Sequence, residues 1–513
     1  MELQYILTSV ILVLLFVYYY LSSQYNYWRK RGIPSADGVI LGLGNMWPVL
    51  SGRVSLSTFC ENLYKKASDQ SMIGFYRLST PMLLVRDPDL VKSILQTNFS
   101  SFSENQIKIN SSKYDELLRF NPFFVSGEKW KKARAPLTNS FSSMKLKTMF
   151  PLFQSAACKM SKYLRDKCSD GNGKVELNLK KFCNKYTGEI SSTGMGIEAY
   201  NFDDVQCQKN EWKYNEILSK IFENSSLATG IRQMILFFMP SLAKLLNISL
   251  TPKEVDQFFR QSAKSILANR KKENRTYNDF MQIVLDYQKT HESEIDEETL
   301  VASHMLSFAV DVYETTAATL SFLGFELAHR PEIQENVRKE IETLLVKYNG
   351  ELNYEALQEM TYLEKVLNES MRINHVVGTT FKLCTKETKL VGADGLTCTV
   401  KPGTAIVICA LGIQMDAKYW PEPEKFDPER FSEEQKNNRQ KFTFLPFGEG
   451  PRTCVGMRMA ILLIKAAIAT ILKDFSIQLS PKMSLPWKRD ETSFLNTPQG
   501  GFLVHVKPLV QSF

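Results

Sequence analysis

A cysteine in a glycine-rich turn is the residue of this sequence whose surroundings best suit chemistry. Cys454 follows the segment 447–453 (FGEGPRT), and an apolar run without proline begins shortly after it, at residues 457–475. That run predicts a helix that starts just beyond the cysteine. The positive end of the helix dipole, the loop amides and Arg452 would all favour a thiolate over a thiol. Cys454 is therefore a candidate metal ligand or nucleophile.

The glycines of this turn have separate uses. Gly448 and Gly450 allow backbone angles that a side chain would forbid, and Gly456 lets the following segment approach whatever the sulfur holds. A buried structural cysteine beside a glycine turn would show the same local pattern. The nine cysteines include no C-x-x-C pair and the five histidines are not spaced as metal ligands, so neither a disulfide framework nor a zinc site is indicated. Cys454 remains the one convincing metal-binding position.

Two pairs of side chains at helical spacing could bind a charged ligand or form an ion pair. Trp130 and Arg134 are four positions apart, so an indole N–H and a guanidinium would lie side by side and suit a carboxylate. A surface cation–π pair fits that spacing equally well. Glu369 and Arg372 are three positions apart, and an exposed pair of this kind is worth only a few tenths of a kcal/mol. Neither pair identifies a function by itself.

The elements that position these residues are expected to be mostly helices. Residues 298–328 predict one long helix, in which Thr315 and Thr316 interrupt an apolar stripe. A threonine at such a place ordinarily bonds back to the preceding turn. The 513 residues are 44% apolar and contain no linker, low-complexity tract or repeat, which favours one large domain.

A smaller β part is expected beside the helices. Residues 73–86 predict two strands around a Thr80-Pro81 turn, and residues 494–506 predict a hairpin. The fold class is therefore mainly α with a small β part. An apolar patch at residues 235–250 fits either core packing or a loop that dips into a membrane surface.

The cysteine loop as a whole resembles that of the cytochrome P450 family. It reproduces the pattern F-x-x-G-x-R-x-C-x-G with Phe447, Gly450, Arg452, Cys454 and Gly456. The resemblance implies that Cys454 is the proximal ligand of haem iron, that Arg452 faces a haem propionate and that Phe447 shields the sulfur. Gly448 and Gly456 then belong to the same haem-binding turn.

Further motifs of the family contain charged groups. Its W-x-x-x-R pattern matches Trp130 and Arg134, which implies that both bind haem propionates. After its E-x-x-R motif the family usually has paired prolines and then an arginine. Here residues 373–378 contain no proline, and Lys382 stands at the later basic position. Lysine can still pair with a propionate, as a point charge without the guanidinium fork.

The E-x-x-R motif itself is matched by Glu369 and Arg372. In the family a second arginine joins them from a P-E-R-F segment, which implies the same role for Arg430. A carboxylate bound by two guanidiniums is a satisfied buried network, so its expected role is structural.

The long helix departs from the family at two positions. The family pattern is small-Gly-x-acid-Thr, and the resemblance implies that Glu314 and Thr315 help to deliver protons to dioxygen. Asp311 and Val312 replace the two small residues, and a β-branched side chain at Val312 would crowd the oxygen site. A local helix bulge could instead turn the valine into protein. The departure supports two alternative functions, a lipophile-binding haem protein with little turnover and a haem enzyme that rearranges peroxides.

The amino-terminal segment predicts a membrane anchor. Residues 5–21 are apolar and would span roughly 25 Å as a helix. Arg29, Lys30 and Arg31 follow this run, which places the rest of the chain in the cytosol and argues against a cleavable signal peptide. Trp28 and Tyr27 fit an interfacial aromatic anchor. The expected organisation is an anchor at residues 1–28 and a haem-thiolate catalytic domain at residues 29–513.

The resemblance implies a monooxygenase similar to microsomal, insect-type members that act on foreign lipophilic compounds. Its cofactor would be haem b (iron protoporphyrin IX), with electrons from NADPH through NADPH-cytochrome P450 reductase and with cytochrome b5 as a second partner. The expected location is the cytosolic side of the endoplasmic reticulum membrane. The net charge of +8 lacks a basic run interleaved with aromatics, so nucleic acid is not an expected partner. Exposed positive charge for docking the reductase is expected at Lys129, Lys131, Lys132 and Lys145.

Overall fold

Helices dominate the computed structural model of the chain, and the strands are short, which confirms the expected fold class. The structure describes residues 2–107, 115–171, 173–203, 214–222, 232, 235–236, 239–273, 275–290 and 295–509. The chain forms two compact units. Unit 1 comprises Met1–Ile107, Val377–Pro421 and Gln440–Thr453, and unit 2 comprises Lys108–Val376, Glu422–Arg439 and Cys454–Phe513. The chain passes from unit 1 to unit 2 between Thr453 and Cys454.

Unit 1 contains most of the strands. Its helical segments are α1 (Glu2–Gln24), η1 (Arg29–Arg31), α2 (Trp47–Leu50), α3 (Leu56–Lys66), α4 (Pro88–Lys92), η2 (Ser93–Thr97), η3 (Phe99–Ser101), α18 (Ala410–Gln414) and η7 (Gly450–Arg452). Its strands are β1 (Met72–Arg77), β2 (Thr80–Val85), β3 (Glu104–Asn105), β5 (Thr379–Leu383), β6 (Thr388–Val391), β7 (Thr397–Val400) and β8 (Ala405–Cys409). Five of them form one sheet in the order β1-β2-β8-β5-β3.

The centre of this sheet is fully buried. Strand β8 is buried at every position and lies parallel to β2, whose residues 82–85 are also buried, as expected for strands covered on both faces. The predicted turn at Thr80-Pro81 is wrong by two residues. Arg77 pairs with Thr80, and the turn is made at Leu78, whose φ is 54°.

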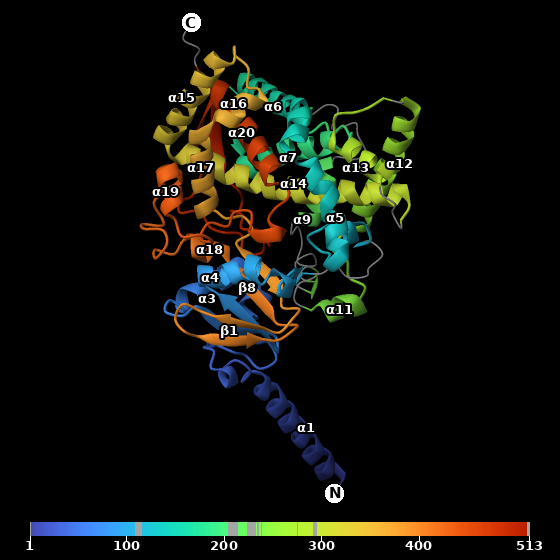
Figure 1. The fold of residues 1–513 in the computed structure, drawn as a ribbon, viewed down its shortest axis with the longest axis vertical. Helices are drawn as coiled ribbons and strands as arrows, with labels where there is room; N and C mark the ends of the chain where they lie inside the picture. The colour runs from blue at the N-terminus through green and yellow to red at the C-terminus, as the bar shows by residue number, and fades with distance from the viewer. Residues whose placement is uncertain are drawn as a thin grey trace. The chain divides into compact units, whose positions relative to one another are not determined.

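Unit 2 is built around the long helix α14 (Glu297–His329) (Figure 1). Its other helices are η5 (Leu117–Phe120), α5 (Gly127–Ser140), α6 (Ser143–Asp170), α7 (Leu179–Gly194), α9 (Tyr214–Phe222), α11 (Pro240–Leu245), α12 (Lys253–Glu273), α13 (Phe280–Thr290), α15 (Pro331–Lys347), α16 (Tyr354–Glu359), α17 (Thr361–Ile373), η6 (Pro428–Phe431), α19 (Glu433–Asn438) and α20 (Met457–Asp474). Its strands are β4 (Val175–Asn178), β9 (Phe475–Leu479) and β10 (Leu503–Pro508).

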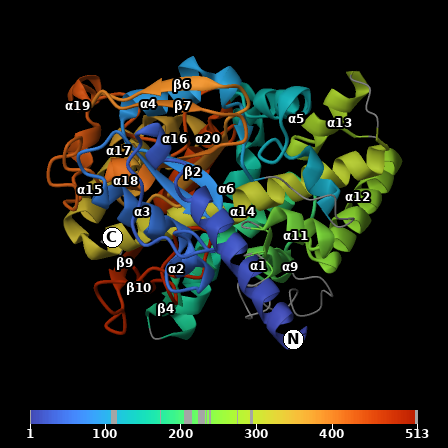
Figure 2. The ribbon, with the colours of Figure 1, turned by 90° about the horizontal axis from the view of Figure 1, so that it is seen from below.

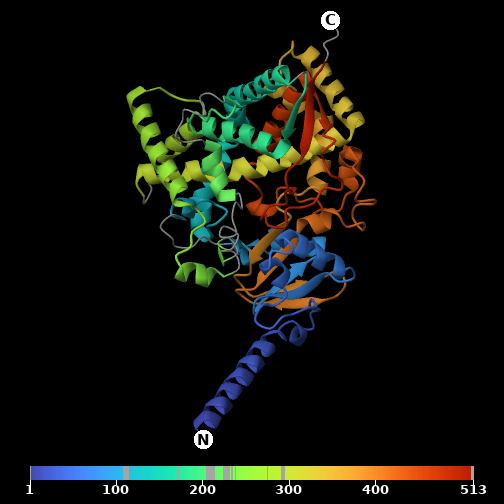
Figure 3. The same ribbon diagram turned by 180° about the vertical axis from the view of Figure 1, so that it is seen from behind.

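Helices surround α14 on several sides, which explains why it is apolar around most of its circumference. It packs against α7, α12, α17 and α20, and Figure 2 shows α12 and α13 beside one end of it and α15 beside the other. The carboxylate of Asp296 caps its first turn by accepting from the backbone N–H of Thr299 at 2.8 Å. Figure 3 shows the same helix from behind, crossing the whole of unit 2.

The hairpin predicted at residues 494–506 does not form. Strand β10 pairs with β9 and with β4 in a three-stranded sheet. Before the turn, Pro498 makes only an isolated bridge to Arg489. Gly500 and Gly501 have the positive φ of a turn, but the returning chain finds its partners in distant strands.

The apolar amino-terminal helix α1 is the one candidate membrane span among the described residues, with a mean hydropathy of 2.0 over its best window. The expectation for Trp28 is wrong, because this residue is 1% exposed and its indole N–H donates to the carbonyl of Phe75 at 3.2 Å. Trp28 thus fixes the segment that follows α1 to the sheet of unit 1. In the patch at residues 235–250, of which 237–238 lie outside the described residues, Leu245 and Leu246 are exposed, so core packing does not account for them.

Candidate functional site

Cys454 stands at the start of α20, as its sequence context predicts. Its side chain is exposed, although protein atoms surround it closely. Desolvation has the largest effect on the pKa of the Cys454 thiol and raises it, and the negative charge of Asp311 raises it further. The backbone N–H groups of Gly456 and Met457 and the charge of Arg134 lower the pKa by less, so it lies above its usual value. Burial of Cys454 thus opposes the thiolate that its sequence context favours, and Arg134 is a cation near the thiol that the sequence did not indicate.

An accessible stretch interrupts the buried length of α14. Residues 301–309 are buried and so are most residues beyond 316, whereas residues 310–312, 314 and 315 are accessible. The helix is regular from Glu297 to His329, so the alternative of a bulge at Val312 is wrong. Val312 is half-buried in this stretch. Accessible side chains in the middle of a core helix are available to contact a ligand.

Asp311 and Thr315 lie one helical turn apart in this stretch. The Thr315 hydroxyl donates to the backbone carbonyl of Asp311 at 2.6 Å, which is the bond to the preceding turn expected of such a threonine. The Asp311 carboxylate accepts from the amide of Asn121, at 3.2 Å to each oxygen. Desolvation raises the pKa of Asp311 to about 7, and Asn121 opposes it only in part. Because Asp311 also acts on the thiol of Cys454, these groups are close in unit 2.

Glu314 makes an ion pair that the sequence did not indicate. Its carboxylate lies 2.7 Å from the ammonium of Lys180 on α7, and both side chains are mostly buried. Lys180 also donates to Asn184 at 2.9 Å. Neither Lys180 nor Asn121 has a sequence signal, because each is brought to α14 only by helix packing.

Trp130 and Arg134 both lie on α5 and are half-buried. Desolvation lowers the pKa of Arg134, and the charge of Cys454 opposes that shift. The guanidinium of Arg134 is thus close enough to Cys454 for each group to shift the pKa of the other.

In unit 1, Lys382 and Arg452 come together. Lys382 is 4% exposed on β5 and donates to the side-chain oxygen of Asn105 at 2.9 Å. Burial, with a smaller contribution from Arg452, lowers the pKa of Lys382 to about 7. Arg452 donates from Nε to the carbonyl of Ser103. Two cationic groups so close together suit a ligand with negative charge.

The turn before Arg452 needs its glycines. Gly448 and Gly450 have φ of 67° and 75°. A Cβ at Gly450 would lie 2.0 Å from the carbonyl oxygen of Leu95, so no side chain fits there. Phe447 is half-buried, and a Cβ at Gly456 would have only the sulfur of Cys454 near it, at 4.0 Å.

Glu369, Arg372 and Arg430 form a network in unit 2. Glu369 and Arg372 are fully buried and paired twice, at 2.7 and 2.8 Å. Arg430 lies 3.5 Å from the same carboxylate, a distance of ion pairing beyond a hydrogen bond. Arg372 donates further to the carbonyl of Pro423 at 2.8 Å, and the backbone N–H of Asp427 donates to Glu369 at 2.9 Å. The network joins α17 to the segment that contains η6.

The comparisons with known proteins agree with this geometry. The family model described as Cytochrome P450 matches residues 41–505. The chain belongs to the cytochrome P450 family. It is 30% identical to cytochrome P450 6k1 of Blattella germanica, with 98% of this chain and 97% of that one covered. It is likewise 30% identical to cytochrome P450 6B1 of Papilio polyxenes, with 98% and 99% covered. It is also 29% identical to probable cytochrome P450 6a19 of Drosophila melanogaster, with 99% of both chains covered.

Membership defines the general chemistry of this P450. It is an oxidoreductase of the monooxygenase class, with a haem cofactor, electrons supplied by a redox partner and hydrophobic substrates. The residues fit the cofactor. The Cys454 thiol is accessible, its surroundings contain the cation Arg134, and the accessible stretch of α14 is close enough for Asp311 to act on it. A soft sulfur ligand beside an opening in a helical core suits haem iron.

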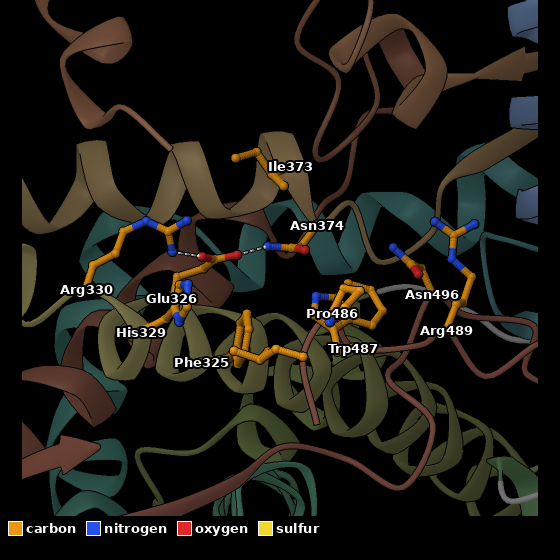
Figure 4. A pocket seen from close by; sticks show the side chains of 11 residues that line it. Phe325, Glu326, His329, Arg330, Ile373, Asn374, Pro486, Trp487, Arg489 and Asn496 are labelled. Carbon is orange, nitrogen blue, oxygen red and sulfur yellow. Dashed lines mark hydrogen bonds and ion pairs between the residues drawn. The ribbon is translucent and has the colours of Figure 1, made fainter. Parts of the chain in front are cut away.

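A separate cavity of about 480 Å³ lies at the carboxyl end of α14 in this P450 (Figure 4). Its wall includes Glu326, which accepts from Asn374 at 2.7 Å and pairs with Arg330. Phe325 and Trp487 form its apolar side. Glu326 is eleven residues beyond Thr315, or about 16 Å along the helix, so this cavity is distinct from the cysteine site.

Proposed function

We propose that this cytochrome P450 binds haem b through Cys454 and inserts one oxygen atom from dioxygen into a lipophilic substrate. NADPH supplies the electrons through NADPH-cytochrome P450 reductase, with cytochrome b5 as a second donor. The observation that carries the proposal is that the Cys454 thiol lies within electrostatic reach of both Arg134 and Asp311, beside the accessible stretch of α14. When bound, haem iron would supply the redox chemistry for cleaving dioxygen, and Cys454 would support it by donating electron density as a thiolate.

Residues of this chain prepare the site for the cofactor. A cysteine must lose its proton to bind a metal, so haem binding releases the proton of Cys454, and Arg134 favours that loss. Arg134 and Trp130 are proposed to bind haem propionates. Arg452 and Lys382 are proposed to have the same role, and a carboxylate partner would keep Lys382 charged.

Protons would be moved by the two polar residues of α14. The Thr315 hydroxyl donates its hydrogen to the backbone carbonyl of Asp311, and the hydroxyl oxygen can still accept a hydrogen bond from water. The pairing of Glu314 with Lys180 fixes its carboxylate at the side of α7. We propose that Thr315 orients a water and that Glu314, after moving away from Lys180, takes up a proton from solvent and passes it to that water.

The proposed setting is the endoplasmic reticulum membrane. Helix α1 is long and apolar enough to cross a bilayer, and the basic residues of η1 (Arg29–Arg31) lie a few residues after its end. Residues 29–513 would then be the catalytic part on the cytosolic side, acting on foreign lipophilic compounds. The exposed residues Leu245 and Leu246 of the 235–250 patch are proposed to touch the same membrane.

The ligand is tested by the ferrous carbon-monoxide difference spectrum. Cys454→Ala should abolish the thiolate-type spectrum, whereas Cys158→Ala, at an exposed cysteine on α6, should preserve it. A thiolate-type spectrum in the Cys454→Ala protein would refute the assignment.

Turnover separates the proposal from the two alternatives that Val312 favours. NADPH consumption with reductase and product formation on a lipophilic panel supports the monooxygenase. Turnover of hydroperoxides alone would identify a peroxide-rearranging enzyme. Ligand binding without either turnover would identify a haem-containing binding protein.

A further inference from the structure

Unit 1 has a cavity of about 510 Å³ that takes no part in the proposed chemistry. Its apolar lining includes Ile40, Trp47, Pro48, Val54, Phe59, Leu63 and Ile73. The volume lies within the range of ordinary small-molecule sites. Two charged side chains, Asp37 and Lys66, also line it. The cavity is therefore amphipathic, with an apolar wall and one charge of each sign.

The chain beside this cavity exposes an apolar surface. Val39, Ile40 and Leu41 lie in a tight turn that is closed by the backbone N–H of Gly44 donating to Ile40 at 2.7 Å. All three apolar side chains are exposed, and so is Trp47, at 39%. Exposed apolar residues grouped in this way mark a surface that meets another apolar phase.

Hydrogen bonds connect this turn to the end of the amino-terminal helix. The backbone N–H of Gly42 donates to the hydroxyl of Tyr25 at 2.9 Å, and Tyr25 directly follows α1. The carbonyl of Tyr25 accepts from the hydroxyl of Tyr76 on β1 at 2.8 Å. The apolar turn is thus held next to the point where the chain leaves α1, whatever the direction of that helix. If α1 crosses a membrane, the turn and the cavity behind it lie at the surface of the same membrane.

The two charges at the cavity indicate the kind of lipid. Lys66 is exposed at the end of α3, and Asp37 is exposed in the segment before the apolar turn. Among the described residues neither side chain has an ion-pair partner. A zwitterionic headgroup has a phosphate to match the ammonium of Lys66 and a cationic nitrogen to match the carboxylate of Asp37, whereas an anionic headgroup without a cation, such as phosphoglycerol, would match only Lys66.

We propose that this cavity binds a zwitterionic phospholipid of the anchoring membrane, with an acyl chain against Phe59 and Leu63, the phosphate at Lys66 and the cationic nitrogen of the headgroup at Asp37. The site rests on the proposed membrane location of α1 and is independent of the haem chemistry. It would hold unit 1 at a fixed depth on the bilayer.

The test uses the full-length, haem-loaded protein in nanodiscs of phosphatidylcholine that contain a small fraction of phosphatidylcholine with a photoactivatable diazirine on its acyl chain. After irradiation, peptides are mapped by mass spectrometry. We expect labels on α1 and, separately, on peptides that contain Val54, Phe59 or Leu63. Labels on α1 report insertion of the anchor, so failure of the anchor and failure of the cavity are distinguishable.

Charge variants supply the control. Lys66→Glu should lower cavity labelling about fivefold, the factor for losing an exposed ion pair worth about 1 kcal/mol, without changing the labelling of α1. Lys65→Glu, on the same helix but outside the cavity lining, should leave both unchanged. The carbon-monoxide spectrum checks that each variant is folded.

Several outcomes would overturn the proposal. One is labelling of α1 without labelling of the cavity. Another is equal loss in the Lys66→Glu and Lys65→Glu proteins. Stronger labelling by a phosphatidylglycerol probe with the same chain would contradict the zwitterionic match at Asp37. Displacement of the label by a lipophilic substrate would show that the cavity belongs to a substrate path.

Discussion

Val312 is the single side chain on which the efficiency of the proposed oxygen chemistry most depends. It is half-buried in the accessible stretch of α14, three residues before Thr315, on a regular helix that cannot turn it aside by a bulge. A β-branched side chain has little rotamer freedom in a helix. It should therefore crowd the space where dioxygen and its relay water bind.

We expect wild-type protein to release a high yield of hydrogen peroxide per product, and Val312→Gly to lower that yield. The substitution costs about 0.5 to 1 kcal/mol of helix stability. The measurement is the ratio of NADPH consumed to product and peroxide formed. Val310→Gly is a matched control, because Val310 is also half-buried in this stretch but two residues away, on another face of the helix. Unchanged coupling in a folded, haem-loaded Val312→Gly protein would show that the valine does not impede oxygen activation.

Among the elements, α17 and the segment containing η6 are joined by two kinds of ion pair that should differ greatly in energy. Glu369→Ala leaves Arg372 charged, fully buried and without its main partner, which should destabilise the protein by about 3 to 5 kcal/mol. The measurement is the urea midpoint together with the haem content.

The exposed pair between the same elements is the control for that prediction. Lys365 and Glu429 lie 2.9 Å apart near the surface, and Lys365→Ala should cost about 0 to 1 kcal/mol. Similar losses in the Glu369→Ala and Lys365→Ala proteins would show that burial does not determine the effect.

Glu326, near the carboxyl end of α14, should make the free energy of unfolding depend on pH. Burial raises the pKa of Glu326 more than Arg330 and Asn374 lower it (Figure 4). The folded protein then holds a proton that the unfolded chain has lost, so stability is greatest below the ordinary carboxyl pKa and falls as pH rises through the raised value. Glu326→Gln removes this dependence and can keep the hydrogen bond to Asn374.

Relative to wild type, the Glu326→Gln protein should therefore gain stability as the pH rises above the ordinary carboxyl pKa. Thermal midpoints measured from acidic to neutral pH are the test. Glu332→Gln, which removes an exposed carboxylate from the first turn of α15, controls for the loss of one charge. A constant difference between the Glu326→Gln and wild-type midpoints at every pH would contradict the prediction.

The elements also show what the sequence could predict. Helices α14 and α20 begin and end within one residue of their predicted bounds, because long apolar periods and caps are local signals. The partners Lys180 and Asn121 were missed, and so was the burial of Trp28, since each depends on packing between distant segments. The hairpin predicted at residues 494–506 failed for the same reason. The sequence signal for its turn is local, but β10 pairs with β4 and β9, which are distant in the sequence.

At the scale of the whole molecule, one positively charged surface lies on the side that contains the cysteine. Helix α5 includes Arg134, which acts on Cys454, and its other face exposes Lys129, Lys131 and Lys132. Lys131 pairs with Glu128 at 2.7 Å, but both side chains are largely exposed and the pair is weak. Exposed charges of one sign near a redox centre steer an oppositely charged partner toward it.

We expect charge reversal at Lys131 and Lys132 to slow reduction by the reductase about tenfold at low salt, with a smaller effect as salt screens the surface. The measurement is the first electron transfer under carbon monoxide in stopped flow, beside peroxide-driven turnover, which needs no reductase and should stay unchanged. Reversal at Lys271 and Lys272 on α12 is the control, because it changes the net charge equally on a helix without a link to Cys454. Equal losses of reduction and peroxide-driven turnover would indicate damaged haem binding, and equal slowing by the α12 reversal would show that net charge, not the surface of α5, attracts the reductase.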